Sequence, residues 1–263
     1  MKKVAVVTGG SSGIGLETCK LLQEQGYIVY DLSRHSNSVS DIKHIDCDIT
    51  NVEQVKNAIT IVIDENKKID LLINNAGIGI SGAIEFTKEE QARKQMEVNF
   101  WGMANMVKAV LPYMREQKSG KIINISSVAA VVSIPFQAYY SISKSAINMY
   151  TLALANEVRP FNIKVCAVMP GDTKTNFTKM REKAEEGDDI YRGVISRSVT
   201  KMEKDEQSGM TPEKIAKLVC KVANKKHVKP LYTAGIQYKA VIVLAKILPY
   251  GLANKIIGRI YSR

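Results

Sequence analysis

Short apolar runs alternate with longer amphipathic stretches along the first two thirds of the chain. The runs VAVVT, YIVYDL, LLINNAG, KIINIS and IKVCAVM are rich in β-branched residues, which is typical of buried parallel strands. Helical periodicity separates them near residues 13–25, 51–66, 88–117 and 139–158. This alternation predicts an α/β fold of the Rossmann type, a doubly wound parallel sheet with helices on both faces, whose ligands bind at the carboxyl ends of the strands.

Nothing in the pattern divides the chain, since it contains no internal repeat or low-complexity linker. We therefore expect residues 1–263 to form a single domain, and 45% hydrophobic content is enough for a large core. The sequence MKKVAVVTGG leads directly into the first strand, so we expect no signal peptide and a cytoplasmic protein. The four cysteines form no CxxC pair and the three histidines are scattered, which predicts reduced core thiols and no metal site.

A glycine-rich turn, TGGSSGIG at residues 8–15, joins the first strand to the amphipathic segment ETCKLLQEQG. Gly9, Gly13 and Gly15 remove side chains where a backbone must approach a pyrophosphate, and the following helix aims its amides at the phosphates. The spacing differs from the GxGxxG of other dinucleotide sites, and many glycine clusters are only turns. Its position between a strand and a helix favours a nucleotide site.

The tip of the second strand bears on the choice between NAD and NADP. Ser33 and Arg34 occupy the position, about twenty residues past the glycine turn, where an acidic residue would hold the ribose of NAD. A guanidinium and a hydroxyl can instead bind a 2′-phosphate, so NADP(H) is favoured. Two alternatives stay open. Asp31 could reach the tip if the register shifts by two residues, and Arg34 could be a solvated loop charge.

Candidate chemistry lies between Ser127 and Lys144, where Tyr140 follows the serine by thirteen residues and precedes the lysine by four. A ketone accepts hydride only if a proton reaches its oxygen, and a phenol can supply it if its pKa of about 10 falls toward neutrality. On a helix Lys144 would lie beside Tyr140 and favour tyrosinate, while Ser127 would polarise the carbonyl. Tyr139 has Ser143 four residues on and is the poorer candidate. The alternative is a chance pairing that only packs.

Several motifs occur together in one order: TGGSSGIG, CDIT at 47–50, NNAG at 74–77, Asn99 in EVNFWG, INISS at 123–127, YSISK at 140–144 and PGDTKT at 170–175. In this the chain resembles the conventional, non-extended short-chain dehydrogenases/reductases over residues 1 to about 175. The resemblance implies that Tyr140 donates or accepts the proton, that Lys144 lowers its pKa and holds the nicotinamide ribose, and that Ser127 orients the substrate oxygen. It implies that Asn99 holds a water linking Lys144 to solvent.

The resemblance also implies a cofactor site. Asp48 and Ile49 would contact the adenine, and Thr175 would lie near the phosphates. Ser12 stands where many NADP-using relatives have a basic residue, and Thr173 stands where an aliphatic one is common, so Arg34 carries most of the argument for NADP. The implied cofactor-binding set is Gly9, Ser11, Gly13, Ile14, Gly15, Ser33, Arg34, Asp48, Ile49, Asn75, Ala76, Gly77, Tyr140, Lys144, Pro170, Gly171, Thr173 and Thr175.

The net charge of +11 is concentrated at the carboxyl end, where eleven Lys or Arg after residue 210 face the single acid Glu213. Residues 236–263 alternate apolar clusters with cations, as in a pair of basic amphipathic helices broken near Pro249. Such a tail can lie on an anionic membrane or cover an apolar pocket, and its alternative is an ordinary surface helix. No run reaches the roughly twenty apolar residues of a membrane span. Because no reading motif accompanies the charge, we expect no nucleic-acid binding.

The part between these regions, residues 176–210, is highly charged and is predicted to be a mobile substrate lid. Its candidate substrate contacts are Phe177, Met180, Tyr191 and Val194, unless they only pack on the sheet. The tail lacks the glycine-rich ending of 3-oxoacyl-thioester reductases and resembles steroid- and retinol-dehydrogenase-like members. This implies a hydrophobic alcohol, ketone or aldehyde substrate, and the family implies a homodimer or homotetramer. A dinucleotide-binding sensor or scaffold without turnover and a 3-oxoacyl-thioester reductase are the competing hypotheses.

Overall fold

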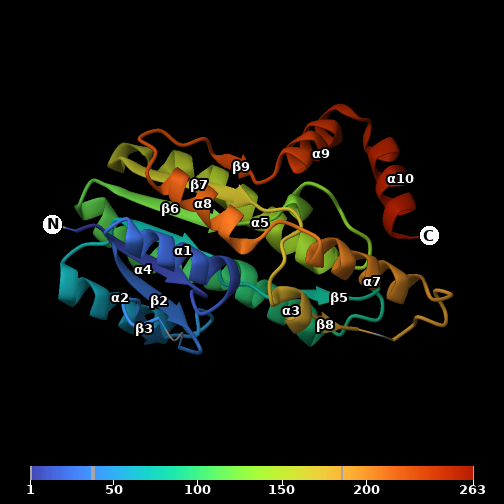
Figure 1. Cartoon of the computed structure of the whole chain (residues 1–263), viewed down its shortest axis with the longest axis horizontal. Helices are drawn as coiled ribbons and strands as arrows, with labels where there is room; N and C mark the ends of the chain where they lie inside the picture. Colours follow the sequence, from blue (N-terminus) through green and yellow to red (C-terminus); the bar gives the residue numbers. More distant parts are fainter. Residues whose placement is uncertain (1, 37–38, 185, 263) are drawn as a thin grey trace.

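The computed structural model of the chain describes residues 2–36, 39–184 and 186–262. Residues 185, in the predicted lid, and 263, in the predicted tail, lie outside this part. A seven-stranded parallel sheet forms its centre, in the order β3-β2-β1-β4-β6-β7-β9 (Figure 1). Its strands are β1 (Val4–Thr8), β2 (Ile28–Ser33), β3 (Lys43–Asp46), β4 (Leu71–Asn74), β6 (Gly120–Ile125), β7 (Ile163–Met169) and β9 (Leu231–Thr233).

The five apolar runs correspond to β1, β2, β4, β6 and β7, and these strands are almost entirely buried. Helices cover both faces of the sheet, so the side chains of a strand meet apolar partners on either side. The doubly wound fold is therefore confirmed. β3 and β9 were not predicted, because their partly exposed residues form no continuous apolar run. β5 (Ile80–Ser81), although buried, and β8 (Glu182–Lys183) were not predicted because each has only two residues; they pair with each other outside the main sheet.

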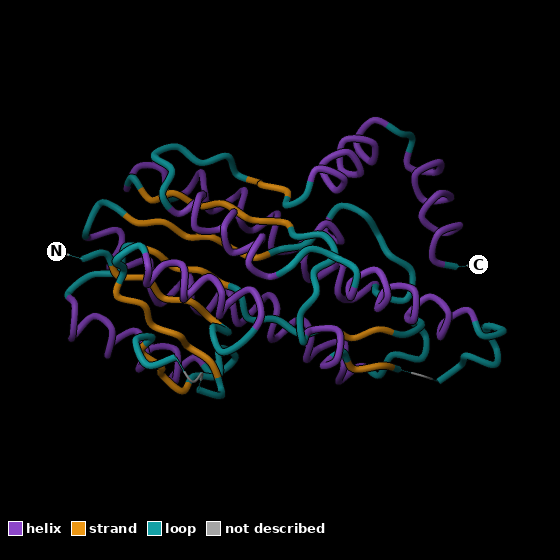
Figure 2. Tube along the Cα trace, viewed as in Figure 1, coloured by secondary structure: helices purple, strands orange, loops and turns teal. Residues whose placement is uncertain are grey.

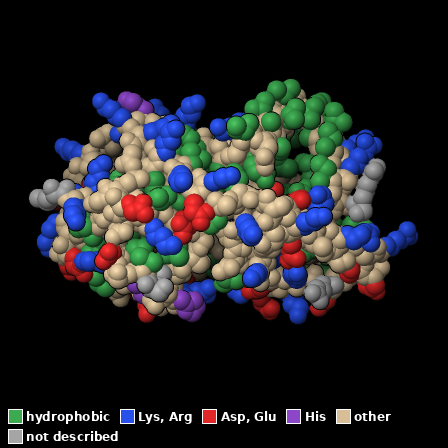
Figure 3. Space-filling model, viewed as in Figure 1, with side chains coloured by type: hydrophobic (Ala, Val, Ile, Leu, Met, Phe, Trp, Pro, Cys, Tyr) green, Lys and Arg blue, Asp and Glu red, His purple; other side chains and the backbone are tan. Residues whose placement is uncertain are grey.

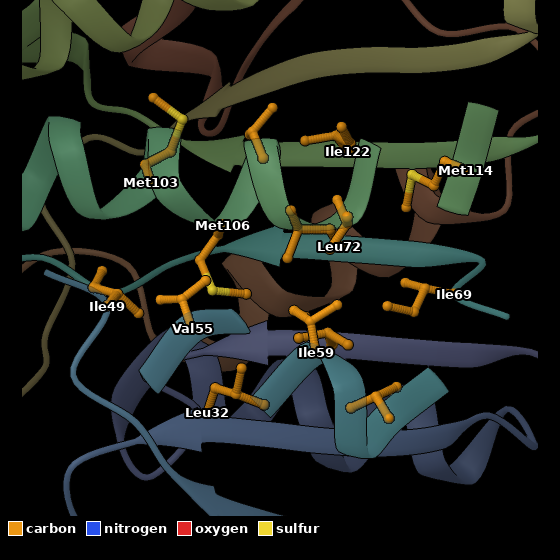
Figure 4. Packing of buried hydrophobic residues seen from close by; sticks show 14 of the residues in the cluster. Leu32, Ile49, Val55, Ile59, Ile69, Leu72, Met103, Met106, Met114 and Ile122 are labelled. Carbon is orange, nitrogen blue, oxygen red and sulfur yellow. The ribbon is translucent and has the colours of Figure 1, made fainter. Parts of the chain in front are cut away.

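One face of the sheet is covered by α1 (Gly13–Glu24) and α8 (Pro212–Ala223), which pack on each other. The other face is covered by α2 (Val52–Asn66), α4 (Met103–Glu116) and α5 (Ala138–Glu157). Figure 4 shows the core on this second face, where Ile59 of α2 and Met106 of α4 lie over Leu72 of β4. The two layers fix the strand ends that carry the site.

The helix predicted over residues 88–117 is interrupted. It consists of α3 (Glu89–Met96), a π-helical segment η1 (Glu97–Gly102) and α4. Single π-helical turns within α-helices are rare and occur frequently at functional sites. Here the π-helical segment contains Asn99, one of the four residues expected to take part in catalysis.

The predicted lid contains α6 (Phe177–Met180) and α7 (Val194–Gln207). The buried face of α7 places Ile195, Val199 and Met202 in an apolar cluster, at helical spacing among the charged residues. The mobility of this segment stays a prediction.

The carboxyl-terminal part forms two helices, α9 (Ile236–Ile247) and α10 (Tyr250–Tyr261), joined through Leu248 and Pro249. The predicted break near Pro249 is confirmed. Together they form an arch that rises from the sheet beyond β9 and returns to α7 (Figures 1 and 2), and residues 236–261 are called the C-terminal arch below. Among the described residues, no helix is long and apolar enough to cross a membrane.

Candidate active site

Three of the four predicted catalytic residues meet at the carboxyl end of β6. Tyr140 and Lys144 lie one turn apart on α5, and Ser127 begins the short 3₁₀ turn after β6. The hydroxyls of Ser127 and Tyr140 are hydrogen-bonded to each other. The Lys144 ammonium donates to the carbonyl of Ile125 at 3.0 Å and lies 5.7 Å from the centre of the Tyr140 ring.

Burial dominates the electrostatics of these groups. Burial raises the pKa of Tyr140 to about 12, and the hydrogen bond with Ser127 lowers this pKa by a smaller amount. Burial also lowers the pKa of Lys144 to about 8. Withdrawal from water disfavours the charged form of each group. The role of Lys144 in lowering the pKa of Tyr140 stays a prediction.

Asn99 supports this group from behind. Its side-chain oxygen accepts a hydrogen bond from the amide of Ile78 at 2.8 Å, and its amide nitrogen donates to the Ile78 carbonyl and to the Ser143 hydroxyl at 3.0 Å each. Ser143 in turn donates to the carbonyl of Tyr140 at 2.7 Å. Asn99 thus ties the π-helical segment to α5 beside Tyr140. Its proposed role in holding a water stays a prediction.

The glycine turn has the geometry that a phosphate cradle requires. Gly9 and Gly13 adopt φ of +64° and +54°, a region that other residues rarely occupy. A Cβ on Gly15 would lie 2.1 Å from the carbonyl oxygen of Gly9, so the turn closes only with glycine there. Ser12 is the N-cap residue of α1, and its side chain makes no capping hydrogen bond in the described structure. The first backbone amides of α1 can therefore bind an anion. These residues fit a dinucleotide.

Asp31 does not lie at the tip of β2. It is fully buried and accepts a hydrogen bond from the amide of Gly10 at 2.6 Å and one from the hydroxyl of Ser33 at 2.8 Å. His44 lies 3.1 Å from its second oxygen. The carboxylate therefore braces the glycine turn, a role that the sequence reasoning missed. Arg34 is exposed and lines the cavity together with Ser33.

A single cavity of about 860 Å³ connects these parts. Of the expected site residues, Gly15, Asn99, Tyr191 and Val194 do not line it. Those that line it are Gly9, Ser11, Gly13, Ile14, Ser33, Arg34, Asp48, Ile49, Asn75, Ala76, Gly77, Ser127, Tyr140, Lys144, Pro170, Gly171, Thr173, Thr175, Phe177 and Met180. Gly15 and Asn99 act from the layer behind, as their contacts show.

Two of the four expected substrate contacts lie elsewhere. The ring of Tyr191 packs edge-on against Phe86 and Phe136, at 6.3 and 5.9 Å between ring centres, and its hydroxyl donates to Glu85 at 2.7 Å. Val194 begins α7 outside the cavity. The structure therefore does not bring these two residues to the cavity, and the contacts of Tyr191 hold it elsewhere. Phe177 lies 5.7 Å from the ring of Tyr140, between ring centres.

Two carboxylates that sequence reasoning did not select also face the cavity. Glu206 of α7 accepts a hydrogen bond from Thr178 at 2.7 Å and pairs with the buried Arg181. Asp172 accepts one from Tyr238 of α9 at 2.7 Å, and burial raises its pKa. Asp172 lies in the PGDTKT motif but was not selected, and no motif marks Glu206, because the lid, the tail and the strand ends come together only in the folded chain.

The far side of the cavity is apolar and belongs to the C-terminal arch. Its inner face is the set of cavity-lining residues Tyr238, Val241, Leu244, Ala245, Leu248, Ala253, Ile256, Ile257, Ile260 and Tyr261. Figure 3 shows hydrophobic side chains over the arch and a hollow beneath it. The cavity is therefore polar near the glycine turn and apolar beneath the arch.

The fold and the site together define an oxidoreductase of the nicotinamide-dinucleotide class. Residues 3–186 match the family model of the short chain dehydrogenases, and the chain belongs to this family. It is 45% identical over 229 residues to a 3-ketodihydrosphingosine reductase of Bacteroides thetaiotaomicron, covering 86% of this chain and 85% of that protein.

Solved structures agree. A short-chain dehydrogenase from Streptomyces avermitilis superposes with a TM-score of 0.82 at 26% identity, over 98% of this chain and 94% of that one. ElxO with NADP bound superposes with a TM-score of 0.77 at 27% identity, over 91% of this chain and all of that one.

Proposed function

We propose that the protein is an NADP(H)-dependent reductase of long-chain ketones, with a substrate of the 3-ketodihydrosphingosine class. The observation that carries the proposal is the continuous cavity that runs from the glycine turn, past Ser127 and Tyr140, to the apolar inner face of the C-terminal arch. A small polar ketone would leave that face exposed to water, whereas a hydrocarbon chain would cover it. The name of the Bacteroides relative supports the same substrate class.

Arg34 and Asp31 favour NADP(H) over NAD(H) as the cofactor. Arg34 lines the cavity at the end of β2, where its guanidinium can hydrogen-bond a 2′-phosphate. Asp31 is committed to the amide of Gly10 and does not line the cavity, so no carboxylate from β2 opposes the phosphate there. ElxO, with NADP bound, supports this choice. When bound, the nicotinamide supplies the hydride.

Side chains of the protein would supply the proton that the reduced carbonyl oxygen accepts. Hydride addition to a ketone produces an alkoxide, which is a stronger base than tyrosinate, so a phenol with a pKa of about 12 can still protonate it. Ser127, hydrogen-bonded to the same phenol, is placed to orient the carbonyl oxygen. In the direction of ketone reduction, Tyr140 would act as the proton donor.

The polar end of such a substrate also has partners. 3-Ketodihydrosphingosine carries an amino group beside its ketone, and an ammonium there can donate to Asp172 or Glu206, which both line the cavity. The proposal therefore assigns the amino group to these carboxylates and the alkyl chain to the arch.

A chain-length series tests the substrate class. NADPH oxidation is followed with 2-amino-3-ketones of increasing alkyl length and with a 3-oxoacyl thioester. We expect kcat/KM to rise by about fourfold for each added methylene until the arch is filled, because each buried CH₂ contributes about 0.8 kcal/mol. Equal kcat/KM for short and long chains would refute the hydrocarbon site. Preference for the thioester would favour the competing reductase class, and NADPH binding without any turnover would favour a sensor.

A further inference from the structure

Helix α9 has two apolar faces, and only one of them lines the cavity. Tyr238, Val241, Ala245 and Leu248 face inward. A second stripe, Ile236, Ala240, Val243 and Ile247, repeats at intervals of four, three and four residues and lies on another side of the helix. These four residues, called the outer stripe below, are exposed: Ile236 to 85%, Val243 to 54% and Ile247 to 73%.

The outer stripe continues into the turn that follows it. Tyr250, at the start of α10, is 92% exposed, and Leu252 is 49% exposed. Large apolar residues in one contiguous exposed patch mark an interaction site more often than single exposed ones do. Figure 3 shows hydrophobic side chains over the C-terminal arch, which stands out from the main sheet in Figure 1.

Positive charge lies beside the patch. Lys239 and Lys246, one heptad apart, border the outer stripe along one side of α9, and the outward side of α10 carries Lys255 and Arg259. The sequence contains no acidic residue after Glu213. A patch of this kind combines an apolar strip with cations alone, which is the composition of helices that lie in the interface of an anionic membrane.

We propose that the C-terminal arch docks the protein on an anionic lipid membrane through the outer stripe. At about 1.5 Å per residue, the 12 residues of α9 extend over roughly 18 Å and cannot cross a hydrocarbon core of about 30 Å. The helix therefore lies along the membrane surface, with the outer stripe in the acyl boundary and the lysines among the headgroups.

A second copy of the chain fits this face less well. A two-fold dimer places the same patch on both subunits, so the flanking lysines of one copy would meet those of the other without any acidic partner on the arch. Anionic headgroups supply the missing negative charge. Charge complementarity thus favours the membrane.

Docking through the outer stripe would bring the inner face of the same helix, and with it the cavity, close to the membrane. Residues of the inner face line the cavity that leads to Tyr140, and the outer stripe lies on the same two-helix arch. A hydrocarbon-chain substrate that resides in the membrane would need to travel only past this arch to reach the site. The docking itself does not depend on the proposed function, because it can be measured without cofactor or substrate.

Vesicle cosedimentation of the full-length protein tests the proposal. Vesicles of phosphatidylcholine alone are compared with vesicles that also contain phosphatidylserine. We expect the wild type to bind the anionic vesicles at least tenfold more strongly. Val243→Glu/Ile247→Glu should reduce that binding at least tenfold, because two charges replace the inserted apolar groups. Lys239→Gln/Lys246→Gln should reduce it by about fivefold per lysine removed.

The matched control is Val52→Glu/Ile61→Glu on α2, where a Val and an Ile are exposed to 46% and 44% and the change in charge is the same. The control should bind vesicles like the wild type, and circular dichroism verifies that every variant is folded. The proposal would be overturned if the wild type bound neither kind of vesicle. It would also be overturned if Val243→Glu/Ile247→Glu bound anionic vesicles as strongly as the wild type. Light scattering that shows a wild-type dimer dissociated by these two substitutions, without vesicle binding, would overturn it too.

Discussion

Replacing Asp31 by Ala tests whether this carboxylate braces the glycine turn or reads the cofactor. The side chain is fully buried and accepts from the amide of Gly10 at 2.6 Å and from the hydroxyl of Ser33 at 2.8 Å. Alanine removes these two bonds and the 3.1 Å contact with His44, and leaves the Gly10 amide without its acceptor beneath the turn. The adjacent Asn variant keeps an oxygen that can accept from Gly10 and gives a conservative control.

The expected loss follows from these contacts. A hydrogen bond to a charged group contributes about 1.5–3 kcal/mol, while removing the buried carboxylate relieves part of its desolvation cost. A net loss of about 3 kcal/mol in the free energy of unfolding would lower Tm by roughly 6–12 °C for a chain of this size. Asp31→Asn should lose less than about 1 kcal/mol, because it retains the bond from Gly10.

Two assays follow the effect: thermal unfolding by circular dichroism and cofactor titration by the fluorescence of the reduced nicotinamide. If Asp31 positions the turn, Asp31→Ala binds NADPH and NADH more weakly by similar factors, since both use the same phosphate cradle. An unchanged Tm together with a tenfold shift of the NADPH/NADH affinity ratio would refute the reasoning. Asp31 would then contact the ribose, as the alternative register of β2 proposed.

Three further substitutions test other parts of the site. Arg34→Ala should weaken NADPH binding about 10- to 100-fold in the same titration, because a charge-assisted contact with the 2′-phosphate is lost, and should leave NADH binding unchanged. Equal weakening of NADPH and NADH binding would contradict the role of Arg34. Gly15→Ala should weaken binding of both cofactors at least tenfold and lower Tm, since the alanine Cβ would lie 2.1 Å from the Gly9 carbonyl oxygen. Wild-type cofactor affinity in this variant would show that the turn can change its conformation to accept a side chain. Lys144→Met should abolish turnover yet unfold at pH 7 with at least the wild-type free energy. The buried ammonium has its pKa lowered from about 10.5 to about 8, so between these pH values the unfolded chain binds more protons and this group adds stability as pH rises. In urea unfolding from pH 7 to 10, this increase in the free energy of unfolding should appear in the wild type and be absent from Lys144→Met.

The sequence predicted the parts of the fold that local patterns encode. Continuous apolar runs located the buried strands β1, β2, β4, β6 and β7, and helical periodicity located α1, α2 and α5. The short strands β3, β5, β8 and β9 escaped, because two to four partly polar residues carry no period. The helix α7 was not located, because charged residues dominate the composition of the lid and mask the buried stripe of Ile195, Val199 and Met202.

Residues that act through long-range contacts were the hardest to predict. Ser127, Tyr140 and Lys144 could be selected because two of them are one helical turn apart and the third belongs to a motif. Glu206 could not be selected, since lid and cavity come together only in the folded chain. Asp31 was considered for the cofactor, and its bond to Gly10 depends on the register between β1 and β2, which places Val7 beside it. The cytoplasmic location and the homodimer or homotetramer stay predictions.

The most direct test of the central claim is the rate of NADPH-dependent reduction of 3-ketodihydrosphingosine by the wild type and by Tyr140→Phe. We expect measurable turnover by the wild type and a decrease of about 10²- to 10⁴-fold in kcat for the variant, with NADPH affinity unchanged, because phenylalanine keeps the ring and removes the proton donor. Equal rates for the two proteins, or NADPH binding by the wild type with no reduction of any long-chain ketone, would contradict the account.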